Sequence, residues 1–130
     1  MSALRKIRAS AGTLRVEIDD PIDLRIQQPS GILRGWLAAR NEELPAAYTF
    51  RIGRMTLPHR PAKRLDVEEA MPDYEVRGFE IRYDLSDLLP HIQNQRLTIR
   101  LKAAGYEAFL FRFRIDDAAI GNCLSTAGGV

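Results

Sequence analysis

The residues best suited to catalysis or metal binding are two histidines and a serine, and their spacing favours neither chemistry. His59 and His91 each follow a proline and form no HxH or HxxxH pair, the spacings that bring two imidazoles to one metal ion. Ser86 lies near His91 but has no G-x-S-x-G sequence around it, and its better-supported role is to cap a short helical turn. We therefore predict no catalytic residue and no metal site.

Adjacent carboxylates are the other groups that could do acid–base chemistry. They occur at Asp19-Asp20, Glu42-Glu43, Glu68-Glu69 and Asp116-Asp117. Neighbouring residues on a strand point to opposite faces, so such pairs do not converge on one substrate atom. The sequence also contains no GxGxxG or GxxxxGK[ST] loop that would hold a phosphate. These observations predict a protein that is not an enzyme and needs no cofactor.

Aromatic and arginine side chains are the candidates for ligand binding. In Arg34-Gly35-Trp36, strict alternation points Trp36 outward beside Arg34. A bulge at Gly35 would instead turn Trp36 into the core. An exposed Trp36 would be a platform for a sugar ring, whereas a buried one would fill the core, and the sequence leaves both readings open. The remaining candidates are Arg54 and the predicted loop residues Tyr74 and Tyr106.

The charges divide the chain into a basic first half and an acidic second half. Arg51 to Arg64 contains five basic residues and no acid, and Asp66 to Glu80 is strongly acidic. We expect these neighbouring blocks to neutralise each other where the chain folds back. Nucleic-acid binding by arginine-rich strands would need exposed aromatic residues between the arginines, so we predict no nucleic-acid partner. The arginines in question are Arg82, Arg100, Arg112 and Arg114.

Length and composition are those of one ordinary domain. The chain has 130 residues, 45% hydrophobic and 28% charged, with a formal net charge of +2. No apolar run approaches the length of a membrane-spanning helix, so we expect no membrane insertion. Cys123 is the only cysteine, and the segment from Met1 to Arg8 lacks the apolar core of a secretory signal. Both features favour a cytoplasmic location.

Alternation of apolar and polar residues is the dominant pattern that would position these side chains. It predicts strands near residues 14–18, 22–26, 48–52, 79–85, 97–101 and 109–115, with Gly105 in the last hairpin. Short helical turns are expected at residues 66–71 and 86–89. The predicted fold class is all-β, a two-sheet antiparallel sandwich of immunoglobulin-like shape. We predict a flexible segment at 1–12, the sandwich at 13–120 and a flexible tail at 121–130.

A set of short motifs resembles a known module. They are Pro29-Ser30-Gly31, Arg34-Gly35-Trp36, Arg64-Leu65-Asp66-Val67, Arg77-Gly78-Phe79, Asp84-Leu85-Ser86-Asp87-Leu88 and Arg96-Leu97-Thr98-Ile99. Their order is similar to a small β-sandwich accessory module of bacterial multidomain proteins that carry glycosyltransferase, methyltransferase or related enzymes of surface-polysaccharide metabolism. The resemblance covers roughly residues 20 to 115 and departs at Leu65, where a proline is expected. It implies that Trp36 and Phe79 are core anchors and that the domain has no catalytic residues.

The resemblance implies a non-catalytic accessory or interaction module within a larger bacterial glycosyltransferase-like or polysaccharide-modifying protein. Its partner would be a covalently linked enzyme domain or another protein, with a glycan as a further candidate partner. One alternative is a stand-alone carbohydrate-binding module, in which aromatic rings stack on sugar and Arg34 or Arg54 bonds hydroxyl or acidic groups. The stacking rings would be Trp36, Tyr74 or Tyr106. A second alternative is a protein–protein interaction domain that self-associates through a sheet edge.

Overall fold

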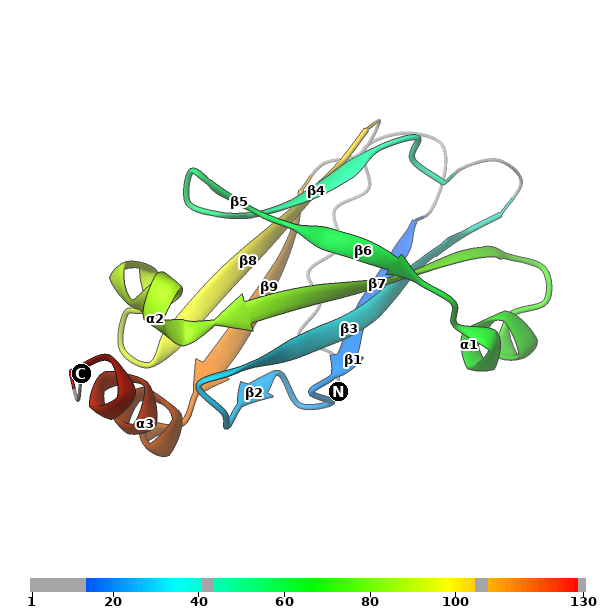
Figure 1. The fold of residues 1–130 in the computed structure, drawn as a ribbon. Coiled ribbons are helices and arrows are strands. Elements are labelled where there is room, and N and C mark those ends of the chain that lie inside the picture. The colour runs from blue at the N-terminus through cyan, green and yellow to red at the C-terminus, as the bar shows by residue number, and fades with distance from the viewer. Residues whose placement is uncertain (1–13, 41–43, 105–107, 129–130) are drawn as a thin grey trace.

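A computed structural model describes residues 14–40, 44–104 and 108–128, and for 124–128 it describes the backbone alone. The protein is mostly β, with 54% strand and 19% helix (Figure 1). The elements run in the order β1 Arg15–Asp20, β2 Arg25–Ile26, β3 Ser30–Ala39, β4 Tyr48–Ile52, β5 Met55–Leu57, β6 His59–Ala62, α1 Leu65–Ala70, β7 Glu75–Asp84, α2 Leu85–Leu88, a 3₁₀ turn Leu89–His91, β8 Arg96–Ala103, β9 Phe109–Ile115 and α3 Asp117–Gly128.

The strands form two sheets. One has four strands in the order β1-β3-β7-β6, and the other has five in the order β2-β9-β8-β4-β5. All neighbouring strands are antiparallel except β2 and β9, which run parallel. The expectation of a wholly antiparallel sandwich is therefore wrong at this edge. Strands β8 and β9 form the predicted hairpin, although Gly105 lies outside the described residues.

The core lies between the two sheets and follows the predicted alternation except at Ile22, which is 87% exposed. Strand β8 alternates exposed and buried residues along its whole length, and β9 nearly does so. All five phenylalanines of the chain, Phe79 among them, are fully buried. No polar or charged residue is buried among the described residues, so the core is held by apolar packing.

The two predicted helical turns are confirmed as α1 and α2, with one change in detail. The cap of α2 is Asp84, whose carboxylate accepts hydrogen bonds from the backbone N–H of Ser86 (3.0 Å) and from its hydroxyl (2.7 Å). The prediction that Ser86 is the cap is therefore wrong, although its hydroxyl supports the cap. Leu65 is the first residue of α1 and is 58% exposed, a position where proline would also fit.

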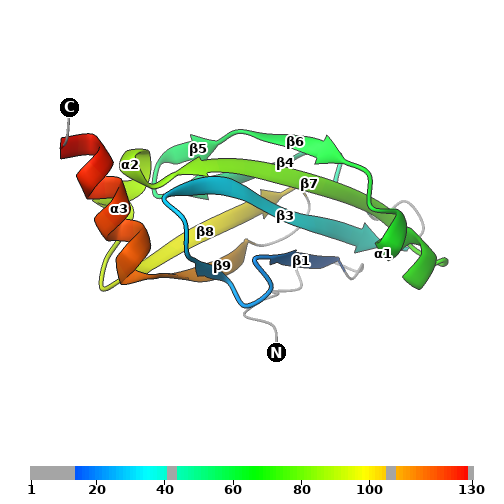
Figure 2. The same cartoon turned by 60° about the horizontal axis from the view of Figure 1, so that its bottom comes forward.

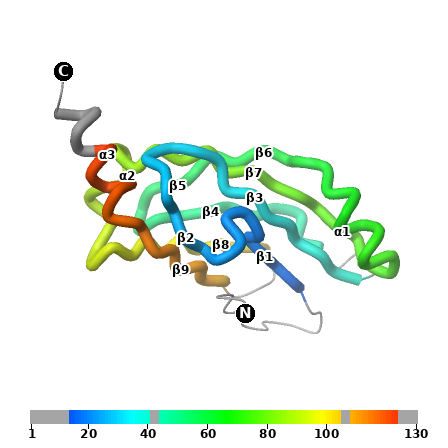
Figure 3. The backbone as a smooth tube through the Cα atoms, turned by 90° about the horizontal axis from the view of Figure 1, so that it is seen from below, coloured from blue at the N-terminus to red at the C-terminus, as the bar shows by residue number. Residues whose placement is uncertain are grey.

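The segment that we predicted to be a flexible tail forms most of α3. This helix begins after Asp116, whose carbonyl accepts hydrogen bonds from the N–H groups of Ala119 and Ile120. Ala119 and Cys123 are buried in the main core, and α3 packs beside α2 at one end of the sandwich (Figure 2). Helix α1 lies at the opposite end (Figure 3). The predicted flexible segment 1–12 lies outside the described residues.

Candidate functional site

Trp36 points away from the main core and is nevertheless buried. The β3–β7 register runs without a break past Gly35, so strict alternation holds and no bulge turns Trp36 inward. A second, smaller apolar cluster encloses the indole between the outer face of the four-stranded sheet and α1, through Ala38 and Val67. Only 8% of Trp36 is exposed, and the Arg15 guanidinium lies 5.7 Å from the ring centroid. The ring therefore presents no open face to a sugar, which removes the geometric basis of the platform reading.

Two glycines of β3 and β7 lie where neighbouring backbone leaves no room for a side chain. At Gly35, a Cβ atom would lie 2.2 Å from the backbone oxygen of Glu17 on β1. At Gly78, which is paired with Trp36 across β3 and β7, a Cβ atom would lie 2.1 Å from the Ala62 backbone oxygen. It would also lie 2.4 Å from Cγ of Arg64. Both positions exclude every residue with a side chain unless the backbone moves.

Arg64 forms an ionic clamp that the sequence analysis missed. Its Nη1 and Nη2 atoms donate to the two carboxylate oxygens of Asp19 at 3.0 and 2.6 Å. Its Nε and Nη2 atoms also donate to Asp66 at 3.0 and 2.8 Å. These bonds raise the pKa of Arg64 and lower the pKa of Asp66. We name Arg64, Asp19 and Asp66 the Arg64 clamp, because it ties the start of α1 to β1.

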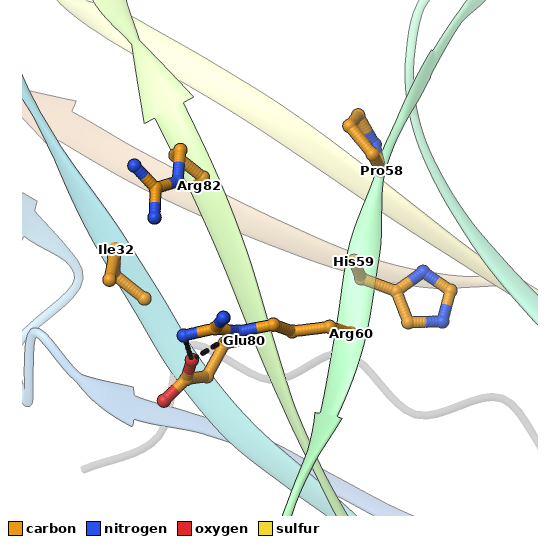
Figure 4. Close-up of a pocket in the computed structure, with 6 residues that line it drawn as sticks. All are labelled: Ile32, Pro58, His59, Arg60, Glu80 and Arg82. Atoms are coloured by element: carbon orange, nitrogen blue, oxygen red, sulfur yellow. Dashed lines mark hydrogen bonds and ion pairs between the residues drawn. The ribbon is translucent and has the colours of Figure 1, made fainter.

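Arg34 also lies on the outer face of the four-stranded sheet, where it is held by carboxylates. Its Nε donates to Glu80 at 3.1 Å and its Nη1 to Asp20 at 3.1 Å. Arg60 donates to the other oxygen of Glu80 at 2.8 Å, and these arginines lower the pKa of Glu80 (Figure 4). The predicted ligand-binding role of Arg34 would require it to leave two partners. The Arg60–Glu80 and Arg64–Asp66 pairs confirm that the basic and acidic blocks neutralise each other here.

A hollow of about 240 Å³ lies beside the Arg60–Glu80 pair, next to Pro58 and Arg82. His59 lines it as well, but its ring points away from Arg60 and Glu80 (Figure 4). The imidazole stacks on Tyr48 with a centroid distance of 4.8 Å, and burial lowers its pKa. Among residues 14–40, 44–104 and 108–128, no group of three or more His, Cys, Asp or Glu side chains could hold a metal ion.

The remaining predicted ligand residues do not form one site. Tyr74 is half-buried against the Trp36 cluster, with the Arg40 guanidinium 5.0 Å from its ring centroid. Arg54 is exposed in the turn between β4 and β5, on the other sheet. Tyr106 lies outside the described residues. The structure thus brings Tyr74 to Trp36 and leaves Arg54 apart from both.

The outer face of the five-stranded sheet carries a group of exposed basic residues. We call it the basic face, and it consists of Arg25, Arg51, Arg96, Arg100, Lys102, Arg112 and Arg114, all exposed. The register sets Arg114 between Arg25 and Arg96, in one row across three strands. Arg51 lies opposite Arg100 in the same way. Within the part of the chain that the structure describes, only Arg25 has a carboxylate partner, Asp116 at 2.6 Å.

The basic face is contoured at the end where α3 begins. A hollow of about 620 Å³ reaches from Gly53 and His91 to Arg96 and Thr98. A second, of about 270 Å³, lies beside Arg114 and is also lined by Asp116 and Asp117. Sequence reasoning grouped Arg82 with this face, but Arg82 is on β7 in the other sheet. The sequence analysis thus named Arg100, Arg112 and Arg114 of this face, and the strand register joins them to the rest.

The described part of the chain contains no helix long and apolar enough to cross a membrane. Comparison with protein-family models, curated proteins and solved structures finds no match to this chain in any of the three.

Proposed function

We propose that this chain is a non-catalytic interaction module that works as part of a larger assembly. The observation that carries the proposal is the basic face, where exposed cations lie side by side on three neighbouring strands with one carboxylate partner among the described residues. Like charges directly opposite each other destabilise a sheet. An anionic surface brought against this face would offset that repulsion, which is the behaviour of an interaction surface.

The larger assembly that we propose is a bacterial glycosyltransferase-like or polysaccharide-modifying protein, in which this domain holds a partner near a separate active site. This part rests on the sequence resemblance alone. A cytoplasmic setting belongs to the same proposal and is supported by the lone, unpaired Cys123.

We further propose that the sandwich is immunoglobulin-like. The order β1-β3-β7-β6 corresponds to strands A-B-E-D of that fold. The order β9-β8-β4-β5 corresponds to G-F-C-C′, with β2 added beside β9. The stand-alone carbohydrate-binding alternative has less support, because Trp36 is buried and Arg34 is bound to two carboxylates.

The size of the endogenous protein tests the interaction module. An antibody against this chain would be used on denatured and on native extracts of the host. A denatured band well above 14.7 kDa would identify a covalently linked partner. A band near 14.7 kDa with a much larger native size would identify a separate one. A protein that is near 14.7 kDa in both extracts would refute the proposal.

A further inference from the structure

The two sheets differ in whether carboxylates lie between their surface arginines. Beside the four-stranded sheet, Arg34, Arg60 and Arg64 each pair with at least one carboxylate of the same chain. Its strand residues Arg15, Arg77 and Arg82 have no carboxylate partner among the described residues. On the five-stranded sheet, the described strands place no carboxylate among the cations of the basic face, and Asp116 meets only Arg25 at its rim. The basic face therefore lacks the carboxylates that lie between arginines of neighbouring strands on the four-stranded sheet.

The basic face is a two-dimensional array and not a single track. Neighbouring strands are about 4.8 Å apart, and residues on one face of a strand repeat about every 6.7 Å. Arg25, Arg114 and Arg96 span three strands in one row, and Arg100 and Arg51 span two strands in another. Arg112 lies between these two rows. A linear polymer in one row would meet only part of the array, whereas a folded surface can meet both rows together.

Two other anionic partners fit this array less well. Single-stranded nucleic acid needs aromatic rings for base stacking, and the outward side chains between the cations are Thr49, Thr98 and Leu110, with no ring among those described. Five strands span roughly 19 Å, which is wider than the roughly 12 Å major groove of a duplex. A planar lipid surface would touch only part of a twisted sheet and would not fill the hollows beside Arg96 and Arg114.

We propose that the basic face docks an acidic surface of a folded protein, whose carboxylates enter between the two rows of arginines and accept paired hydrogen bonds from them. The inference rests on the proposed interaction module and names the chemistry of its partner. Guanidinium groups bind carboxylates through two parallel N–H donors, as Arg64 does with Asp19 in this chain. With few apolar groups on the face, the interface is expected to form rapidly and to weaken with salt.

Thr98 is the position from which this partner can be identified. It is exposed, lies opposite Arg112, and is flanked along β8 by Arg96 and Arg100. The experiment places a photoreactive residue there, Thr98→benzoylphenylalanine, in the full protein in its native host. After irradiation, the cross-linked product is digested separately with protease, nuclease and lipase, and the linked peptide is sequenced. The matched control is Arg82→benzoylphenylalanine on the outer face of the other sheet.

The expected product is a conjugate that resists nuclease and lipase and whose linked peptide is rich in Asp and Glu. The yield of the conjugate should fall at least fivefold in an Arg100→Gln/Arg112→Gln background. It should recover when the two arginines are replaced by acidic residues and the linked acidic residues of the partner by basic ones. A nuclease-sensitive or lipid conjugate, a neutral peptide, or equal yield from the control position would overturn the proposal. Thr49, also exposed on this face, serves as a second probe position if the Thr98 variant does not fold.

The two proposals fail in different ways. If the native size is large but no acidic peptide is linked through Thr98 or Thr49, the interaction module stands and the acidic partner of the basic face is refuted. If the protein is near 14.7 kDa in both extracts and no conjugate forms, both proposals are refuted.

Discussion

Removing the guanidinium of Arg64 should loosen α1 and expose Trp36. In Arg64→Met the apolar stem that passes Gly78 is largely kept, and the bonds to Asp19 and Asp66 are lost. The side chains of Arg64 and Asp19 are 16% and 34% exposed, so this pair is partly shielded from water. Asp66 is 67% exposed, so the loss of its bonds to Arg64 is expected to change the free energy of unfolding little.

The magnitude follows from the Arg64–Asp19 pair. Hydrogen bonds to charged groups contribute about 1.5–3 kcal/mol, and the lower end applies because Asp19 can regain water in the variant. We therefore expect the free energy of unfolding to fall by about 1.5 kcal/mol. With an unfolding entropy of roughly 2.1 cal/mol/K per residue over 130 residues, this corresponds to a Tm lower by about 5 °C.

Two measurements separate the global effect from the local one. Urea unfolding followed by far-UV circular dichroism gives the free energy of unfolding. Acrylamide quenching reports on Trp36 alone, because it is the only tryptophan of the chain. Arg64→Met should be destabilised and should be quenched more strongly than the wild-type protein. The control is Arg82→Met, which removes an exposed arginine from the outer face of the same sheet.

The reasoning is refuted if Arg64→Met loses less than about 0.5 kcal/mol, the range of an ordinary exposed ion pair, and Trp36 quenching is unchanged. A double-mutant cycle with Asp19→Asn tests the cause. If the two substitutions add without coupling, the clamp is not what holds α1 in place.

Three further predictions follow from other contacts. Gly78→Ala should lower the free energy of unfolding in urea by more than about 2 kcal/mol, because its Cβ meets a backbone oxygen. Gly121→Ala in α3 has open space around it and should be neutral or stabilising, so equal effects of the two substitutions would contradict the prediction. Because burial lowers the pKa of His59, the folded state favours neutral imidazole, so the contribution of His59 to stability is complete above pH 6.5 and is lost as pH falls through the lower folded pKa. The urea midpoint of the wild-type protein should therefore fall with pH more than that of His59→Phe. An equal pH dependence in the two proteins would count against this prediction. Replacing Arg100, which faces Arg51, by Thr should raise the Tm at low salt but not at high salt; a decrease at low salt would argue against repulsion on the basic face.

Local alternation predicted β1, β4, β7, β8 and β9, but the short edge strands β5 and β6 were not predicted. The buried face of β8, formed by Leu97, Ile99 and Leu101, can be read from the sequence of that strand alone. Helix α3 was missed because its small and polar residues form no broad apolar stripe, and its burial depends on Ala119 and Cys123 meeting the core.

The surface features could not be predicted, because they depend on contacts between distant segments. The outward direction of Trp36 follows from alternation, but its burial requires α1 to pack over the sheet. The Arg64 clamp joins residues of β1 and α1 that are far apart in the chain. The basic face needs the register of four strands, without which Arg82 is indistinguishable from Arg112.

The parallel pairing of β2 with β9 also determines how the molecule responds to force. These strands come from opposite ends of the described chain, and they are joined by backbone hydrogen bonds from Arg114 to Leu24 and from Asp116 to Ile26, each 2.9 Å. Tension between the chain ends acts first on β1, which is paired with β3, and on α3. Once it reaches β2 and β9, it would slide one strand along the other and load both bonds at once in shear. Because β2 is two residues long, this mechanical clamp is short. A pull from a tethered neighbour would therefore release β2 before the β8–β9 hairpin separates.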